Sequence, residues 1–185
     1  PGTGERAGLH PHLASARQLR GYAFLSAKPM LVLLNNADDD PSLPELSGPL
    51  SDENTMVIRG KLEHELAQMS DEESADLLKE FNISASATDR VIRRSYDLMG
   101  LISFFTVGED EVRAWTIKKG TAALDAAEAI HTDLKKGFIR AEVVAYDYFM
   151  EAGSMAAAKK KGTFRLEGKT YEVCDGDIIT IRFNL

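Results

Sequence analysis

Cysteine is almost absent from this sequence of 185 residues: Cys174 is the single one, so no disulfide can form within the chain. Such sparing use of cysteine is typical of proteins in a reducing cytoplasm. Long apolar runs are also missing, because no stretch approaches the roughly 20 residues needed to span a membrane. The sequence opens without a signal-peptide pattern. We therefore expect a cytoplasmic protein that has no membrane partner.

Positive charge is in short supply, with 22 Lys and Arg against 29 Asp and Glu and a formal net charge of −7. Because attraction to phosphates needs a positive surface, this balance argues against broad, sequence-independent coating of nucleic acid. The deficit is uneven, since residues 1–100 carry 10 basic and 16 acidic residues, whereas residues 101–185 carry 12 and 13. The net charge therefore does not argue against a local basic face on the second half of the chain.

Extremes of composition are absent as well. The fractions of 44% hydrophobic and 28% charged residues are ordinary for a globular protein and fit neither disorder nor a fibre. A length of 185 residues allows one large domain or two small ones, each with a real core.

A phosphate-binding loop is a further absence. Such a loop needs Lys and then Ser or Thr at the start of a helix, but Gly2-Thr3-Gly4 is followed by Glu5-Arg6. Between Gly162 and Gly168 there are five residues where the motif has four, and a strand is expected after them instead of a helix. We interpret this second pattern as a turn.

Spacing typical of metal or catalytic sites is also missing. His131, Glu142 and Asp147 lie on different predicted elements without ligand spacing. We predict neither a catalytic residue nor a metal site in this chain. Because phosphoryl transfer depends on a phosphate cradle and Mg²⁺, the chain by itself should not hydrolyse nucleotides.

Hydrophobic patterns in the first half predict two buried strands and then helices. The continuous apolar run from Met30 to Leu34 is typical of a strand covered on both faces of a parallel sheet, and Thr55–Ile58 is similar. Ser70 is the expected cap of one helix. The predicted helices cover residues 13–24, 62–69, 71–81 and about 88–99.

The last of these helices has one apolar and one basic side. Arg90, Arg93 and Arg94 lie together, away from the apolar residues. They suit a phosphate contact or a solvated helix face, and we prefer the solvated face.

From residue 101 the pattern changes to short strands around one helix. Thr121 is expected to cap an alanine-rich helix over residues 121–131, and Gly137 to end it. Cys174 is interpreted as a small buried residue within a strand. The predicted strands cover residues 102–106, 112–117, 138–145, 163–166, 171–174 and 178–183.

Several groups of residues in this half carry a resemblance to one family. They are Glu111–Thr116, Ile130–Asp133, Gly137–Val143, Asp175–Asp177 and Arg182–Asn184. On these residues the chain resembles the C-terminal part of the Obg-like ATPases of the YchF type, and the similarity extends back to about Leu25.

The resemblance implies an α+β fold in three parts. Before the part that carries the resemblance, the sequence pattern predicts a leader and a helix over residues 1–24. Residues 25–100 are implied to be the C-terminal remnant of an α/β P-loop NTPase (G) domain, with two parallel strands plus helices. Residues 101–185 are implied to be a ubiquitin-like β-grasp TGS domain.

Members of this family begin with a phosphate-binding half that is missing from this sequence, which opens at Pro1. We therefore expect the C-terminal portion of a translation-associated nucleotide switch. The resemblance implies ATP or GTP with Mg²⁺ for the full-length protein and no cofactor for this chain alone. The alternative is a stand-alone TGS-type module that binds RNA or protein without hydrolysing nucleotide.

Polar residues follow the first predicted strand, at the edge where parallel sheets bind ligands. The resemblance places Asn35, Asn36 and Asp38 in the N-K-x-D motif that reads guanine in G-proteins. Asp suits guanine, whereas YchF-type proteins usually have Glu in the last place, so the preference between ATP and GTP stays open. The alternative is that the cluster simply turns the chain.

Arg59, Gly60 and Lys61 follow the second strand, in the place of the S-A-K motif of G-proteins. There a backbone amide binds the guanine oxygen and the lysine covers the base, so the resemblance implies the same contacts here. Lys61 also suits an ordinary surface position at the start of a helix.

Basic residues of the second half form a predicted rim at the turns of the sheet. The resemblance to TGS domains implies contact with RNA or the ribosome, whereas the alternative is that lysine-rich turns keep a sheet edge soluble. The rim residues are Lys118, Lys119, Lys135, Lys136, Arg140, Lys159, Lys160 and Lys161.

Overall fold

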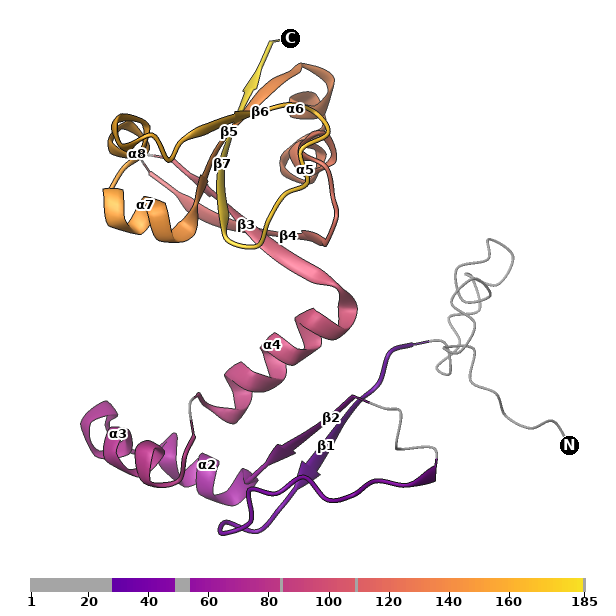
Figure 1. Ribbon diagram of the computed structural model, residues 1–185, viewed down its shortest axis with the longest axis vertical. Helices are drawn as coiled ribbons and strands as arrows, with labels where there is room; N and C mark the ends of the chain where they lie inside the picture. The colour runs from indigo at the N-terminus through magenta and orange to yellow at the C-terminus, as the bar shows by residue number, and fades with distance from the viewer. Residues whose placement is uncertain (1–27, 49–53, 84, 109, 185) are drawn as a thin grey trace, which may run out of the picture. The chain divides into compact units, whose positions relative to one another are not determined.

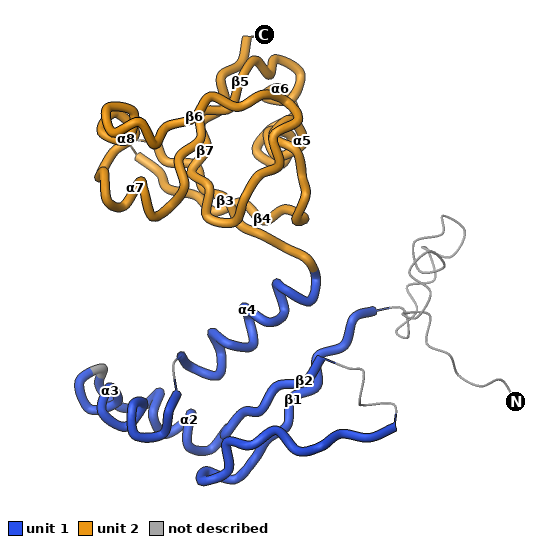
Figure 2. Tube along the Cα trace, viewed as in Figure 1, with its two compact units in different colours: residues 1–99 blue, residues 100–185 orange. Residues whose placement is uncertain are grey.

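The computed structural model describes residues 28–48, 54–83, 85–108 and 110–184. Within them the chain has a mixed α+β fold and divides into two compact units between Met99 and Gly100 (Figure 2). The helix predicted over residues 13–24 lies outside the described residues. No helix of the described ranges is both long and apolar enough to cross a bilayer.

The first unit contains the two predicted strands, and they are parallel (Figure 1). In their register Asn35 lies opposite Ile58, so both strands end at the same edge. The elements of this unit are β1 (Leu31–Asn35), β2 (Asn54–Ile58), α2 (Gly60–Leu66), α3 (Asp71–Glu80) and α4 (Ala87–Met99).

Ser70 caps α3 as predicted. Its hydroxyl accepts from the Glu73 backbone N–H, and the Glu73 carboxylate accepts from the Ser70 backbone in return, which completes a capping box. The hydrogen bond from the Ser70 hydroxyl lowers the pKa of the Glu73 carboxyl. Ser86 plays the same part before α4, where its hydroxyl accepts from the Asp89 N–H at 3.1 Å.

The core of the first unit is small. Leu62, Leu66 and Ile83 are its buried members, and side chains of α3 pack against them. Leu33 of β1 is 41% exposed, so within the described residues the apolar run is not covered on both faces as predicted. On the predicted apolar side of α4, Val91 and Leu98 are half-buried whereas Ile92 is 53% exposed, so described residues cover that side only in part.

In the second unit, the described residues form one five-stranded sheet of order β4-β3-β7-β5-β6. β3 and β7 are parallel, and the other neighbours are antiparallel. The strands are β3 (Leu101–Val107), β4 (Val112–Lys118), β5 (Phe138–Ala145), β6 (Arg165–Glu167) and β7 (Asp177–Phe183).

One helix, α5 (Ala123–Ile130), fills one side of this sheet (Figure 1). Its buried alanines, Ala123, Ala126 and Ala127, are small and let the helix approach the strands closely. Phe104 of β3 and Ile179 of β7 belong to the same core, at 0% and 1% exposure. The alanine-rich pattern therefore predicted this helix correctly.

Several predictions for the second unit were wrong. Residues 171–174 make only an isolated bridge between Glu172 and Ala122, and Cys174 is exposed, because the Asp177 carboxylate binds the Cys174 backbone and pulls the segment into a turn. Thr121 does not cap α5, since its hydroxyl donates to the Lys118 carbonyl.

Three short helices were not predicted. They are α6 (Thr132–Lys136), α7 (Tyr146–Ala152) and α8 (Met155–Lys161). Each has five to seven residues, too few for a periodic pattern to stand out. Gly137 closes α6 and needs to be glycine, because a Cβ there would collide with the backbone carbonyl of Asn184.

A buried carboxylate holds the segment before β7. Asp177 is 1% exposed and accepts hydrogen bonds from the Tyr171 hydroxyl at 2.7 Å and the Cys174 N–H at 2.9 Å. Arg165 lies at 3.4 Å from its other oxygen. Burial and the bond to Asp177 raise the pKa of the Tyr171 phenol.

Replacing Tyr171 with Phe should destabilise the second unit by about 1–3 kcal/mol, because a buried carboxylate loses a donor. Trp115, the single tryptophan, packs against this unit's core, so its fluorescence during urea unfolding measures the loss. Tyr148→Phe is the control: Tyr148 is 52% exposed, and its effect should stay within about 0.5 kcal/mol. Equal effects of the two changes would contradict the role given to Asp177.

Candidate functional site: the turns after β1 and β2

Two turns leave the first unit's sheet at the same edge. The first, residues 35–38, follows β1, and the second, residues 59–61, follows β2 and leads directly into α2. Their proximity results from the parallel register, in which the last residues of the two strands are paired.

A hydrogen bond joins the two turns. The Gly60 N–H donates to Asn35 Oδ1 at 2.9 Å. A Cβ on residue 60 would lie 3.0 Å from the same oxygen, tighter than ordinary side-chain contacts. Glycine therefore allows the turn after β2 to approach the Asn35 side chain.

Asp38 lies beside this bond. Its Oδ1 accepts from the Leu62 N–H at 3.1 Å, and its Oδ2 lies 3.8 Å from Lys61 Nζ. The carboxylate thus caps the first turn of α2, where the free N–H groups attract negative charge. The Asp38 side chain is 42% exposed, so it also remains accessible from solvent.

Asn36 stabilises the loop that follows. Its side-chain amide donates to the Ser42 carbonyl at 2.8 Å and to the Asp40 carbonyl at 3.2 Å. The Ser42 hydroxyl and backbone N–H both donate to the Asp40 carboxylate and lower its pKa. Asn36 therefore has its amide engaged within its own loop.

Arg59 turns its side chain into the protein. It is 7% exposed, and Nη2 donates to the Phe81 carbonyl at 2.7 Å. Nη1 lies 3.4 Å from the Asp38 carbonyl, so the guanidinium also supports the first turn. Of the six predicted base-binding residues, Asn35, Asp38, Gly60 and Lys61 come together at the edge, whereas Asn36 and Arg59 brace it.

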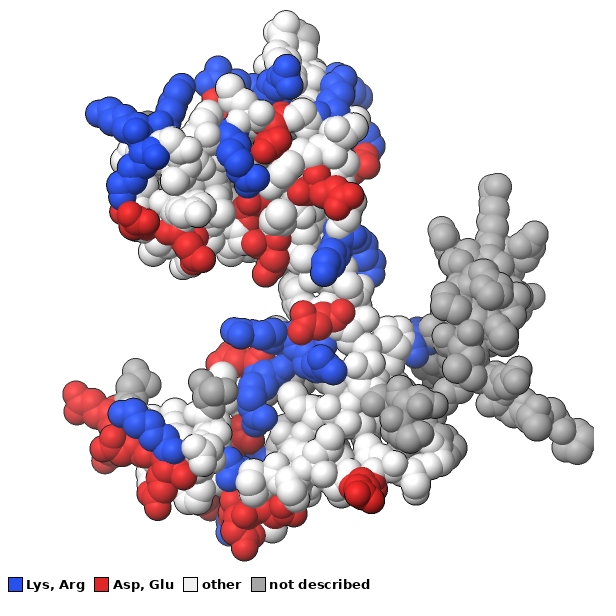
Figure 3. Space-filling view, in the orientation of Figure 1, with Lys and Arg blue, Asp and Glu red and all other residues white. Residues whose placement is uncertain are grey.

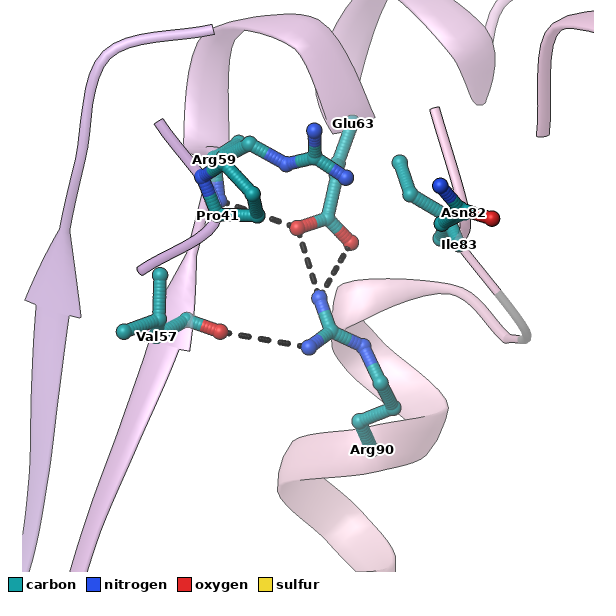
Figure 4. Close-up of a pocket in the computed structure, with 7 residues that line it drawn as sticks. All are labelled: Pro41, Val57, Arg59, Glu63, Asn82, Ile83 and Arg90. Atoms are coloured by element: carbon teal, nitrogen blue, oxygen red, sulfur yellow. Dashed lines mark hydrogen bonds and ion pairs between the residues drawn. The ribbon is translucent and has the colours of Figure 1, made fainter. Parts of the chain in front are cut away.

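Sequence reasoning missed a second layer of the site. Glu63 and Arg90 form an ion pair with an N–O distance of 2.6 Å, beside a pocket of about 160 Å³ (Figure 4). The prediction of a solvated face for Arg90 was wrong, because its side chain turns toward Glu63. Glu63 follows Arg59 by four residues, the spacing of a return contact at a helix start, but nothing in the sequence pointed to Arg90.

The predicted basic rim of the second unit is dispersed over several elements. Lys135 bonds to Asp125 and Glu128, which raise its pKa, and Lys136 lies 3.0 Å from Asp133. Lys161 lies 2.9 Å from Glu151. These lysines already have acidic neighbours.

Lys159 and Lys160 differ from them. They lie on α8, and Lys135 and Lys136 lie on α6, so neither pair is at a turn as predicted. The ammonium of Lys159 stands over the Phe164 ring at 5.4 Å from its centroid. Basic side chains gather over α8 in Figure 3. Of the remaining rim residues, Lys118 ends β4, Lys119 follows it, and Arg140 lies on β5.

The solvent-exposed groups at the edge of β1 and β2 are charged. Asp38 and Lys61 place a carboxylate and an ammonium at this edge, both at least partly exposed, whereas the Gly60 and Leu62 amides are already bonded to Asn35 and Asp38. The exposed pair can form hydrogen bonds with a polar ligand. Across the described residues, no group of three or more His, Cys, Asp or Glu side chains is arranged to hold a metal ion.

Comparison with known proteins identifies relatives. Residues 101–184 match the family model YchF-GTPase_C, described as a protein of unknown function (DUF933). The chain is 43% identical over 176 residues to the ribosome-binding ATPase YchF of Bacillus subtilis, covering 88% of this chain and 47% of that protein. With human Obg-like ATPase 1 it shares 42% identity over 176 residues, covering 90% and 44%.

A solved structure agrees. The YchF GTPase of Schizosaccharomyces pombe superposes with a TM-score of 0.69 at 31% identity, over 85% of this chain and 44% of that one. The chain thus spans about half the length of the relatives it matches. It belongs to the YchF family of Obg-like ATPases and corresponds to the C-terminal part of its members.

Proposed function

We propose that this chain supplies purine-base recognition to a nucleotide-binding, translation-associated protein of the YchF family. The bond between the Gly60 N–H and Asn35 Oδ1, at 2.9 Å, carries the proposal. It joins the two turns that the motif resemblance names, with the Asp38 carboxylate next to them. Asp38 and Lys61 would contact the base directly, while Asn35, Asn36 and Arg59 hold the turns.

The two units then have separate parts in the proposal. Residues 25–100 are assigned to the C-terminal part of the NTPase domain, which the parallel β1–β2 pair supports. Residues 101–185 are assigned to a β-grasp TGS domain, which a mixed sheet filled by α5 supports. ATP or GTP with Mg²⁺ would be the ligand of the longer proteins, whose phosphate-binding loop this sequence lacks.

Asp38 sets the preferred base in this proposal. A carboxylate accepts hydrogen bonds from the N1–H and amino group of guanine, whereas adenine has no N1–H. Each charge-assisted bond contributes about 1.5–3 kcal/mol, or roughly 10- to 150-fold in affinity. Without phosphate contacts, the total binding should be near 1 mM at best, about 4 kcal/mol.

Titrating the ¹⁵N-labelled chain with GMP and AMP tests this assignment. GMP should shift the Gly60 and Leu62 amide signals at lower concentration than AMP. Asp38→Asn should weaken GMP binding by about tenfold or more, and Asp38→Glu should narrow the difference between the two bases. Asp39→Asn is the matched control. Shifts that ribose 5-phosphate reproduces, or that Asp38→Asn leaves unchanged, would refute base recognition.

A second candidate function is contact with RNA on the ribosome through the second unit. The relatives' name, ribosome-binding ATPase, motivates it, and α8 offers the chemistry. Residues 155–169 hold five basic residues and one acidic residue in a chain whose net charge is −7. Lys159 and Phe164 place an ammonium beside an aromatic ring, a combination suited to phosphates and bases.

Two double variants, each lacking one pair of lysines, distinguish a specific RNA contact by α8 from general charge attraction. Lys159→Gln with Lys160→Gln should weaken binding to a fluorescein-labelled RNA hairpin and reduce the salt slope by about 1.4 to 1.8. The control, Lys135→Gln with Lys136→Gln, removes the same charge where acidic neighbours already offset it. Equal losses from both pairs, or affinity unaffected by salt, would count against an α8 contact.

A further inference from the structure

The second layer of the site begins with a nearly buried carboxylate. The Glu63 side chain is 5% exposed, and its Oε1 accepts from the Arg59 backbone N–H at 3.0 Å. Both of its oxygens accept from Nη2 of Arg90, at 2.6 and 2.7 Å. Figure 4 shows the carboxylate between these two partners. These charge-assisted hydrogen bonds hold the Glu63 carboxylate firmly in one position.

Arg90 reaches this place from α4, which is distant in sequence. Its Nη1 donates to the Val57 carbonyl at 3.2 Å, so the guanidinium also bonds the strand that enters the second turn. The Arg90 Nε is buried without a hydrogen-bond partner among the described residues. The two terminal nitrogens of the guanidinium thus bind Val57 and Glu63, while its third nitrogen, Nε, is left without a bond among these residues.

The same turn carries the amides of the candidate base site. Arg59 N–H binds Glu63, Gly60 N–H binds Asn35, and Leu62 N–H binds Asp38. Three backbone amides within residues 59–62 therefore each donate to a side chain. Arg90 in turn binds one of these side chains, that of Glu63. If Arg90 is removed, Glu63 becomes an unpaired buried charge and must move or take up a proton.

We infer that Glu63 and Arg90 are positioning residues, which fix the Arg59–Lys61 turn for base recognition and couple it to α4. The inference rests on the proposed function, because it concerns the same site. α4 ends at Met99 and β3 begins at Leu101, so only Gly100 separates the coupled helix from the second unit along the chain. Base occupancy and the order of α4 should therefore be linked.

Amide hydrogen exchange on the 185-residue chain measures the positioning without any ligand. Arg90→Met should speed exchange of the Gly60 and Leu62 amides by about tenfold or more. Arg90→Lys keeps the charge on Glu63 and should restore part of the protection. Glu63→Gln keeps an acceptor for the Arg59 N–H but loses the ion pair. Its amide exchange rates should lie between those of the unchanged chain and those of Arg90→Met. Arg93→Met, on an exposed residue of the same helix, should change neither amide.

GMP titration of the same variants measures recognition. Arg90→Met should raise the GMP dissociation constant about fivefold or more, and Arg90→Lys should recover part of the affinity. If GMP does not bind the unchanged chain, base recognition fails, yet the exchange rates still decide the positioning role. If GMP binds but Arg90→Met and Glu63→Gln alter neither exchange nor affinity, the inference is overturned and base recognition stands.

Discussion

The parallel pairing of β1 and β2 is the constraint on which the candidate site depends. Parallel strands end at the same edge, so residues 35–38 and 59–61 meet although more than twenty residues separate them. The Asn35–Gly60 and Asp38–Leu62 bonds then use backbone amides that a helix start leaves free. Side-chain bonds to these amides thus fix the two turns, and Asp38 and Lys61 remain exposed beside them.

Buried carboxylates organise both units in a similar way. Glu63 in the first unit and Asp177 in the second are each almost inaccessible, and each accepts from a backbone N–H as well as from side chains. A carboxylate that accepts from several donors costs less free energy to bury than one with a single partner. If it is removed, all of those donors lose their hydrogen-bond acceptor. Each of these residues therefore helps to determine the path of a turn.

Several lysines of the second unit form ion pairs with neighbouring carboxylates, which changes how they can bind a phosphate. A count of lysines indicated a basic rim around the second unit, but Lys135, Lys136 and Lys161 each lie against a carboxylate. Such pairs are partly neutral toward an incoming phosphate, because a polyanion must compete with the resident carboxylate. Lys159 and Lys160 at the end of α8 are therefore more suitable for phosphate contact than the pair that follows α5.

The sequence alone determined the parallel strands, the capping box at Ser70, the alanine-rich helix and the resemblance to the YchF family. The strands themselves, the capping box and the helix follow from local patterns, in which a residue's neighbours along the chain largely decide its conformation. It did not determine that Arg90 binds Glu63, that Cys174 lies in an exposed turn, or that Lys159 lies on a helix. The Arg90–Glu63 pair was decided by tertiary structure, because the two residues lie 27 positions apart and only the fold brings them together. The turn at Cys174 depends in the same way on the burial of Asp177, which accepts from its backbone N–H.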